Sequence, residues 1–344
     1  MARVDLTVMG AGIFGLSIAW EAASRGARVQ VIDPFGAGSG ASGGLVGALA
    51  PHVPENWNAK KAFQLESLLM AAGWWAAASA ASGLPHGYLR SGRLQPLDDA
   101  QAIAHAQARA AEAATLWQGR ALWQVVPATR AAWEPVSPTG LLIHDTLTAR
   151  LSPRMALACL AAAITAQGGE IVAAGDPAGP TVWATGAAGL QDLSHHFGKP
   201  VGAGVKGQAL SLAYAAANDP QLFVDGLHIV PHADGTVAIG STSENQWTTD
   251  SFDELGESLH ARAIAALPAL QGAKVVARWA GIRPRARTRA PMLGAWPDRQ
   301  GHYIANGGFK IGFGMAPKVA VTMADLILSG HDTIPQGFRV TDNL

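Results

Sequence analysis

Residues 4–33, VDLTVMGAGIFGLSIAWEAASRGARVQVID, contain the pattern that decides the fold. The apolar run at residues 4–9 predicts a short buried strand, and a helical pattern follows from Leu16 to Ala23. A second strand is predicted at residues 28–32, where the chain reaches Asp33. The glycines between the first strand and the helix have the spacing G-x-G-x-x-G. A strand, glycine turn, helix and strand in this order form the dinucleotide-binding fingerprint in its required context.

Each glycine of this fingerprint, and the aspartate after it, has a physical role in binding a dinucleotide. Gly10 permits the tight turn, Gly12 lets the backbone approach a pyrophosphate, and Gly15 lets the helix pack closely on the strand. The helix N-terminus offers unpaired N–H groups and a positive dipole end to phosphates. Asp33, at the tip of the second strand, is placed to accept hydrogen bonds from ribose hydroxyls.

Bulk composition describes a compact globular chain. Of its 344 residues, 49% are hydrophobic and 15% are charged, and the formal net charge is zero. The length predicts two intergrown domains, and the charge balance gives no general attraction to nucleic acid or an anionic membrane. The single cysteine, Cys159, excludes an intramolecular disulfide. With no signal-peptide pattern and no uninterrupted run of about 18 apolar residues, we expect a cytoplasmic protein without a membrane span.

The rest of the chain alternates helical and strand patterns. A glycine-rich segment at residues 36–52 is interleaved with apolar side chains, which favours a buried extended loop over a flexible linker. Helices are predicted at residues 59–82, 100–116, 153–167 (capped by Ser152, with Pro153 first) and 255–267. Strands are predicted at residues 88–97, 141–144, 170–173 and 181–186, with an antiparallel run at 210–212, 228–232 and 237–240 that turns at Asp234-Gly235.

Further motifs follow the fingerprint in a specific order. They are Ala41-Ser42-Gly43, Ala184-Thr185-Gly186, Trp279-Ala280-Gly281-Ile282-Arg283-Pro284, Pro291-Met292-Leu293-Gly294 and Asn306-Gly307-Gly308-Phe309-Lys310-Ile311-Gly312. In this order, over nearly the whole chain, they resemble the D-amino-acid oxidase superfamily of FAD enzymes, most closely the glycine oxidase and sarcosine oxidase branch.

The resemblance implies an α/β plus α+β fold. An FAD-binding Rossmann-type domain (residues 1–84, 150–208 and 275–344) would be intergrown with an antiparallel-sheet substrate domain (residues 85–149 and 209–274). FAD would be bound noncovalently, because Cys159 lies outside the C-terminal region where sarcosine oxidases attach their flavin. The short interval between Val172 and Val182 implies that the small β-meander beside FAD is trimmed. No metal site is predicted.

The resemblance also implies which residues bind the cofactor. The ADP half would contact the fingerprint, and the flavin would lie near residues 307–310, where backbone amides and a positive charge favour the anionic reduced flavin. The implied cofactor-binding residues are Gly10, Gly12, Ile13, Phe14, Gly15, Asp33, Ser39, Ala41, Ser42, Gly43, Val172, Thr185, Gly186, Gly307, Gly308, Phe309 and Lys310.

Three residues are implied at the substrate. Arg283 matches the arginine that clamps the substrate carboxylate, and a guanidinium suits a carboxylate through two parallel bonds; the alternative is a surface salt bridge. Lys310 lies where sarcosine oxidases place a carboxylate-binding lysine, or it is a solvated loop lysine. His228 stands where family members often carry a tyrosine, so it is either a hydrogen-bond donor to substrate or a core histidine.

Arginines recur at alternate positions from Arg283 to Arg289, which in an extended segment places all four on one face. One interpretation is a solvated rim with acidic neighbours, and the other is a substrate with more than one negative charge. The row is similar to a segment in the flavin domain of the bacterial enzyme that removes carboxymethyl groups from modified tRNA uridines.

The implied reaction is oxidation of a small amino acid or N-substituted glycine, by deamination or demethylation. A hydride passes to flavin N5, water hydrolyses the imine, and dioxygen, the expected acceptor, yields hydrogen peroxide. The alternatives are an FAD-dependent 2-hydroxy-acid dehydrogenase and an oxidase acting on a carboxymethyl group of modified tRNA. The neutral charge weighs against nucleic acid as a partner, and the sequence is compatible with a homo-oligomer.

Overall fold

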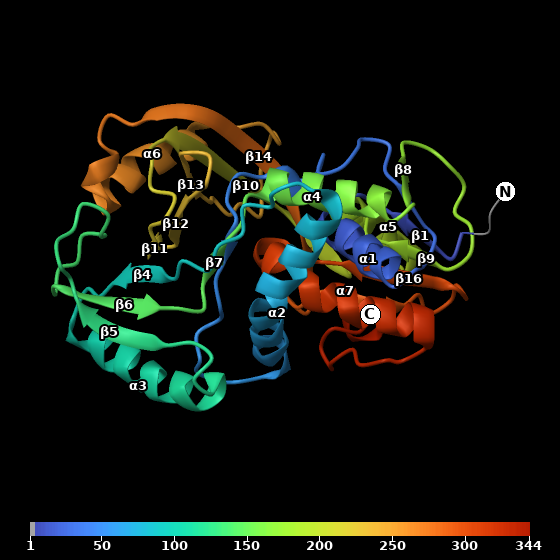
Figure 1. Cartoon of the computed structure of the whole chain (residues 1–344), viewed down its shortest axis with the longest axis horizontal. Helices are drawn as coiled ribbons and strands as arrows, with labels where there is room; N and C mark the ends of the chain where they lie inside the picture. The colour runs from blue at the N-terminus through green and yellow to red at the C-terminus, as the bar shows by residue number, and fades with distance from the viewer. Residues whose placement is uncertain (1–3) are drawn as a thin grey trace.

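The computed structural model describes residues 4–344, which form two lobes built on two large sheets (Figure 1). The six-stranded sheet has the order β15-β16-β9-β1-β2-β8. Its bounds are Met292–Ala295, His302–Asn306, Thr181–Trp183, Leu6–Met9, Val29–Ile32 and Glu170–Val172 in that order. All neighbours are parallel except the edge pair β15 and β16. Strand β1 is mostly apolar because helices cover the central strands of such a sheet.

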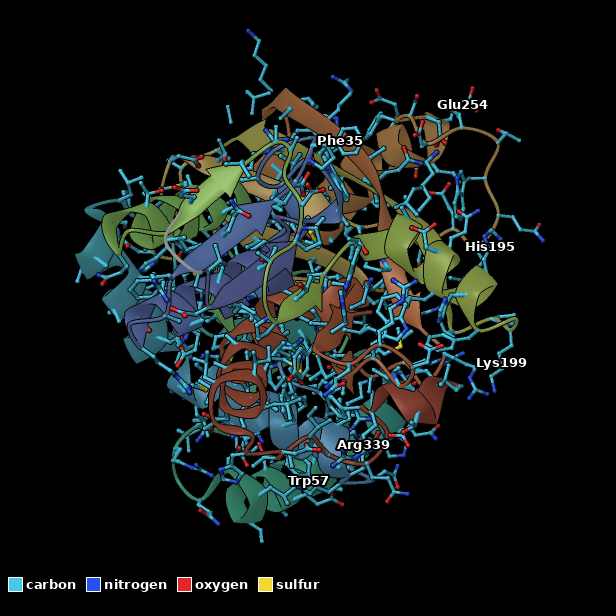
Figure 2. The ribbon with its side chains drawn as sticks, turned by 90° about the vertical axis from the view of Figure 1, so that its right-hand side faces the viewer. Phe35, Trp57, His195, Lys199, Glu254 and Arg339 are labelled. Carbon is cyan, nitrogen blue, oxygen red and sulfur yellow. The ribbon has the colours of Figure 1, made fainter. Side chains whose placement is uncertain are left out.

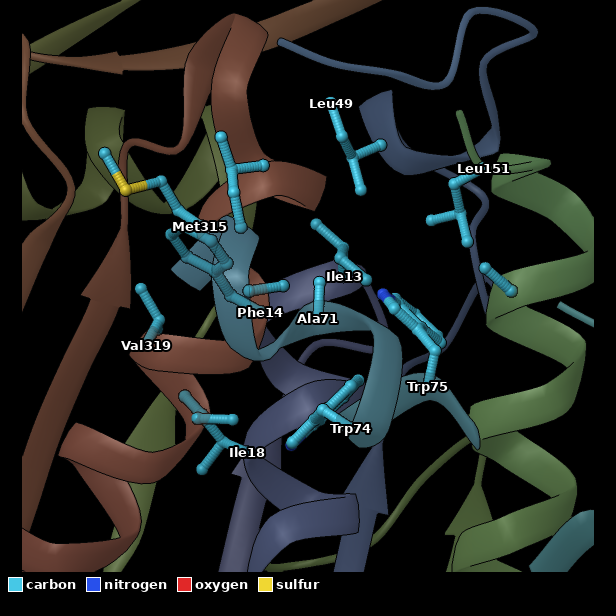
Figure 3. Close-up of a cluster of buried hydrophobic side chains, with 14 of the residues drawn as sticks. Ile13, Phe14, Ile18, Leu49, Ala71, Trp74, Trp75, Leu151, Met315 and Val319 are labelled. Atoms are coloured by element: carbon cyan, nitrogen blue, oxygen red, sulfur yellow. The ribbon is translucent and has the colours of Figure 1, made fainter. Parts of the chain in front are cut away.

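Several helices belong to the lobe with the six-stranded sheet (Figure 1). They are α1 (Ile13–Ser24), α2 (Ala59–Ser82), α4 (Pro153–Ala166), α5 (Gly186–His196) and α7 (Gly312–Ser329). Figure 3 shows side chains from α1, α2 and α7 meeting in one buried cluster, with Phe14, Trp74 and Met315 among them. The segment Phe309–Ser329 is long and apolar enough to cross a membrane by length and composition alone. It packs here on α1 and α2, so its apolar face belongs to the core.

The eight-stranded sheet forms the other lobe, with the order β14-β10-β13-β12-β11-β4-β6-β5. Its bounds are Lys274–Ala286, Gly202–Ala213, Thr236–Gly240, Leu227–Pro231, Gln221–Val224, Arg93–Pro96, Leu141–Asp145 and Trp123–Pro127 in that order. Every pair is antiparallel except β11 and β4. Helices α3 (Ala100–Trp117) and α6 (Glu254–Ala266) pack on this sheet, and the short strands β3 (Ala48–Leu49) and β7 (Ala149–Arg150) pair separately.

The fold class expected from the sequence is confirmed, and several local expectations need correction. Ser152 precedes Pro153 at the start of α4, but its side chain makes no capping hydrogen bond there. The strand expected within residues 181–186 ends at Trp183, and the small-residue turn expected at its end leads into α5, which begins at Gly186. Helices α5 and α7 were not predicted, and neither were strands β3, β5, β7, β11, β14, β15 and β16.

The division into domains stays a prediction, but two of its boundaries fall within long strands. Strand β10 crosses the boundary at residues 208 and 209, and β14 crosses the boundary at residues 274 and 275. These strands pair with each other over most of their length, from Gly202 opposite Ala286 to Ala213 opposite Lys274. Each of these two strands therefore continues across a boundary that the sequence places between the two domains.

Candidate active site

A large cavity of about 910 Å³ lies where the two sheets meet. On one side it is lined by residues at the carboxyl ends of parallel strands, namely Met9, Ile32, Ala184 and Asn306. Ligands of open α/β sheets bind at this edge. The other side is formed by the large sheet and includes residues 279–284 of β14. The volume is near the upper limit of the roughly 300–1,000 Å³ range of ligand pockets, which suits a large cofactor together with a small substrate.

The fingerprint glycines have the local geometry that the sequence predicts. Gly10 has φ +104°, and a Cβ there would lie 2.5 Å from the carbonyl oxygen of Ala184. At Gly15 a Cβ would lie 1.9 Å from the carbonyl oxygen of Gly10, so any side chain would push α1 off the turn. Gly12 has an ordinary φ of −79° and lines the cavity, where a Cβ would meet only Ser42 Oγ at 3.2 Å.

Asp33 and Ser42 fix the turn around the helix N-terminus. The Asp33 carboxylate accepts hydrogen bonds from the backbone N–H groups of Ala11 (2.7 Å) and Phe35 (2.9 Å), one on each oxygen. Each oxygen keeps a second lone pair that can accept a ribose hydroxyl. Ser42 Oγ accepts from the N–H of Ile13 at 2.9 Å and so joins the loop at residues 39–44 to α1.

Most of the cofactor residues implied by the sequence lie around this one cavity. Those that line it are Gly10, Gly12, Ile13, Phe14, Asp33, Ser39, Ala41, Ser42, Thr185, Gly186, Gly307, Gly308, Phe309 and Lys310. Gly15, Gly43 and Val172 do not. Gly43 packs against Gly38, where a Cβ would lie 2.2 Å from the carbonyl oxygen. The carbonyl of Val172 accepts from the N–H of Asp33 within the sheet, outside the cavity.

Arg283 lies on β14 in the wall of the cavity and is only 7% exposed. Its Nη1 donates to Ser241 Oγ at 2.6 Å, and its Nη2 donates to the carbonyl oxygens of Thr242 (2.5 Å) and Lys206 (3.3 Å). Burial lowers its pKa to about 10, while nearby Glu244 opposes the shift. The guanidinium therefore stays charged near neutral pH in a fixed position. No salt bridge within 4 Å involves it in the part of the chain that the structure describes.

Lys310 and His228 also line the cavity. Lys310 keeps part of its surface in solvent while the rest is covered by protein, and its pKa is lowered by this partial burial and by the charge of Arg283. For His228, burial together with the charges of Arg93 and Lys310 lowers the pKa to about 3, so its imidazole is neutral at neutral pH. The buried Nδ1 of His228 has no hydrogen-bond partner among residues 4–344. The structure thus brings all three residues implied at the substrate into one space.

Comparison with known proteins accounts for this cavity. The family described as FAD dependent oxidoreductase (DAO) matches residues 5–326. The chain belongs to this family. Its cofactor is therefore FAD, and the strand edge with its glycine turn and Asp33 has the donors and the space that an ADP moiety needs.

Individual relatives agree with this assignment. Glycine oxidase of Pseudomonas putida is 35% identical over 133 residues, which is 38% of this chain and only 36% of the relative. Glycine oxidase of Geobacillus kaustophilus is 26% identical over 94% of this chain and 93% of its own. The crystal structure of the latter enzyme covers 99% of both chains with a TM-score of 0.85 at 21% identity. Iminodiacetate oxidase of Chelativorans sp. BNC1 has the same fold, with a TM-score of 0.84, 20% identity and coverage of 97% and 98%.

The remaining arginines of the row do not share the face that their spacing predicted. Strand β14 ends at Ala286, and after it Arg287 turns to donate to the terminal carbonyl oxygens of Asp342, Asn343 and Leu344. Arg289 has φ +63° in the following turn. Only Arg283 and Arg285 remain in the strand, so only these two arginines of the row can share one face of it.

Some residues in or beside the cavity were not predicted from the sequence. Asn306 Nδ2 donates to the carbonyl of Gly186, and its Oδ1 accepts from the N–H of Gly307, so it joins two loops that line the cavity. Phe35 is 83% exposed at the rim (Figure 2) and also lines the cavity next to Asp33. Gly207 on β10 was missed because its role depends on strand pairing: a Cβ there would lie 2.1–2.7 Å from the Arg283 guanidinium.

Gly207→Ala is expected to lower kcat/KM about 10- to 100-fold with most of the change in KM, because overpacking of about 1–3 kcal/mol would displace the Arg283 guanidinium. Steady-state kinetics on the FAD-loaded enzyme measure the effect. Gly73→Ala, in α2 where a Cβ meets nothing within 4 Å, is the matched control and should keep wild-type kinetics. Equal activity of Gly207→Ala and wild type would contradict this role.

The neutral His228 predicts an acid-sensitive fold. In the unfolded chain a histidine takes up a proton as the pH falls through about 6.5, whereas folded His228, with a pKa of about 3, does not. Acidification from pH 6.5 towards 3 therefore lowers the contribution of His228 to the free energy of unfolding by up to about 1.4 kcal/mol per pH unit. This contribution is fully present only above pH 6.5.

His228→Gln is expected to have a shallower fall in Tm than wild type between pH 7 and 4. Calorimetry of both proteins over this range tests the expectation. The control is His195→Gln, because His195 is exposed at the end of α5 (Figure 2). A slope unchanged in His228→Gln would show that other groups carry the acid sensitivity.

Proposed function

We propose that this chain oxidises a small amine that carries a carboxylate, either an amino acid or an N-substituted glycine, with dioxygen as electron acceptor. The observation that carries the proposal is the buried Arg283 in the wall of the FAD cavity, held by three acceptors and paired with no carboxylate among residues 4–344. A fixed, desolvated guanidinium is a strong and specific ligand for a carboxylate. The glycine oxidase relatives support an amine as the group beside that carboxylate.

The residues around Arg283 account for binding and orientation. Arg283 would hold the carboxylate and so fix the position of the carbon next to the nitrogen, with Ser241 and the carbonyl of Thr242 keeping the guanidinium still. FAD, when bound, supplies hydride acceptance and reoxidation by dioxygen to hydrogen peroxide. Catalysis by the protein is then mainly positioning.

The same residues favour the reactive protonation state of the substrate. An ammonium placed near Arg283 and Lys310 is disfavoured by like charge, which lowers the pKa of the bound amine and favours its neutral form. His228 is neutral at working pH and would add no competing charge. No residue needs to act as general base in this scheme, because the substrate amine loses its proton to solvent on binding.

Anaerobic mixing of the FAD-loaded protein with glycine, sarcosine, other amino acids and 2-hydroxy acids tests the proposal. Loss of the long-wavelength flavin band with an amine, and its return with stoichiometric hydrogen peroxide on admitting air, is the expected result. Bleaching by 2-hydroxy acids alone would overturn the proposal in favour of a hydroxy-acid dehydrogenase. Bleaching by an amine without peroxide formation would replace dioxygen with another acceptor.

A further inference from the structure

Three cations surround one aromatic ring at the substrate side of the cavity. The ring of Phe309 lies 5.5 Å from the guanidinium carbon of Arg283, 5.6 Å from that of Arg285 and 5.7 Å from Lys310 Nζ. A backbone bridge between Arg285 and Gly308 holds the two segments together. Arg283, Phe309 and Lys310 all line the cavity, so this cluster, the Phe309 cation cluster, belongs to the site where the substrate binds.

Glu244, the carboxylate whose charge acts on Arg283, already pairs with another cation. Lys206 is fully buried, with Nζ 2.5 Å from Asp253 and 3.7 Å from Glu244. Gln208 Nε2 donates to both of these carboxylates as well. These two carboxylates are therefore engaged by Lys206, and neither forms an ion pair with Arg285 or Lys310.

Arg285 and Lys310 are the cations that lack a compensating charge. Within residues 4–344, no ion pair of 4 Å or less joins either of them to a carboxylate. The other acidic residues that line the cavity, Asp33, Asp192 and Asp250, make no such pair with them either. Positive charges placed close together repel one another unless a bound anion neutralises them. The pKa of Lys310 is already lowered by burial and by the charge of Arg283.

One carboxylate bound to Arg283 would leave the Lys310 ammonium without an anionic partner. We propose that the substrate is an amine with two carboxylates, one held by the Arg283 guanidinium and the second by the Lys310 ammonium, with Arg285 adding positive potential across Phe309. This inference rests on the proposed function, because it assumes that Arg283 binds the first carboxylate. Amines with two carboxylates, such as iminodiacetate or an N-carboxymethyl amino acid, have this chemistry.

Two ethers that contain no oxidisable nitrogen test the binding step directly. Oxydiacetate has two carboxylates, and methoxyacetate has one on an otherwise similar frame. Titration of the FAD-loaded protein, followed by the flavin spectrum and by calorimetry, should show oxydiacetate binding on the order of tenfold more tightly at low ionic strength. Because Lys310 is exposed, this preference should shrink as salt is raised.

Lys310→Met is expected to weaken oxydiacetate binding more than methoxyacetate binding and so to abolish the preference for oxydiacetate, and Arg285→Met is expected to reduce that preference. The matched control is Lys199→Met, because Lys199 lies on the surface away from the cavity (Figure 2) and should retain the wild-type preference. Equal affinities of the two ethers in the wild-type protein would overturn the inference. So would a preference that survives Lys310→Met.

Two further measurements distinguish a binding site for a second carboxylate from positive charge that only stabilises the anionic reduced flavin. If the positive charge serves reduced flavin instead, Lys310→Met will weaken formation of the flavin–sulfite adduct and leave the ether preference intact, which would overturn the inference. In turnover, iminodiacetate should have a higher kcat/KM than sarcosine. Oxidation of sarcosine with no gain from the second carboxylate would refute the inference alone, whereas bleaching by no amine at all would refute the proposed function.

Discussion

Arg283→Gln is expected to lower kcat/KM for the amine substrate about 30- to 5,000-fold, the equivalent of about 2–5 kcal/mol for removing one partner of a desolvated charge pair. Arg283 is 7% exposed and already aligned by Ser241 and two carbonyl oxygens. The substrate carboxylate would therefore gain a charged, preorganised partner without ordering a flexible side chain. A neutral amide can donate one hydrogen bond but supplies no charge.

Arg283→Lys is expected to fall between wild type and Arg283→Gln. It keeps the positive charge but loses the fork of parallel donors, and an ammonium cannot reach Ser241 and both carbonyls while also meeting a carboxylate. Kinetics of both variants over a range of substrate concentrations separate KM from kcat. A loss confined to KM would indicate binding alone, and a loss in kcat as well would show that Arg283 also sets the reactive orientation.

The control for both variants is Arg287→Gln, which changes a later arginine of the same row. Arg287 bonds terminal carbonyl oxygens and does not line the cavity, so its loss should change Tm but not kcat/KM. FAD content and Tm of every variant exclude misfolding as the cause. A kcat/KM for Arg283→Gln within a few-fold of wild type would remove Arg283 from the substrate site.

The sequence could predict those parts of the site whose geometry is local. The turn at Gly10, the carboxylate of Asp33 and the close packing at Gly15 all follow from one short stretch of consecutive residues, and the structure has each of them. Val172 differs, because its expected place depended on a resemblance and its carbonyl is engaged in the sheet with Asp33. The helices at residues 59–82 and 100–116 were predicted from their sequence pattern, and the structure adds side-chain caps at Asn58 and Asp99.

The surroundings of Arg283 could not be predicted, because they are assembled by strand pairing. The β10–β14 register brings Lys206 and Gly207 beside residues 281–282, which lie much later in the chain. No sequence pattern near Gly207 indicates that the Arg283 guanidinium will pack against it. Likewise, no sequence pattern near Lys206 indicates that two carboxylates will pair with its ammonium. The row of four arginines was visible, but the end of β14 at Ala286 leaves only Arg283 and Arg285 in the strand, and of these two Arg283 lines the cavity.

Gly12→Ala is expected to weaken FAD binding about 5- to 150-fold while leaving the apoprotein folded, since an added methyl group in a filled space costs about 1–3 kcal/mol. Gly12 is the one fingerprint glycine where this separation can be made. Its φ of −79° suits alanine, and the added Cβ meets only Ser42 Oγ at 3.2 Å, so the fold itself has little reason to reject it. The added methyl group would instead clash with the pyrophosphate, which must approach this backbone closely.

Fluorescence titration of the apoprotein with FAD measures the affinity, and the Tm of the apoprotein measures the fold. Gly40→Ala is the matched control, because Gly40 also lines the cavity, has a negative φ of −88° and has nothing within 4 Å of an added Cβ. It should bind FAD nearly as wild type does. In contrast, Gly15→Ala should unfold the turn, because its Cβ would overlap the carbonyl oxygen of Gly10. If Gly12→Ala bound FAD as tightly as Gly40→Ala, the pyrophosphate would have to lie elsewhere, and the helix N-terminus of α1 would lose its assigned role.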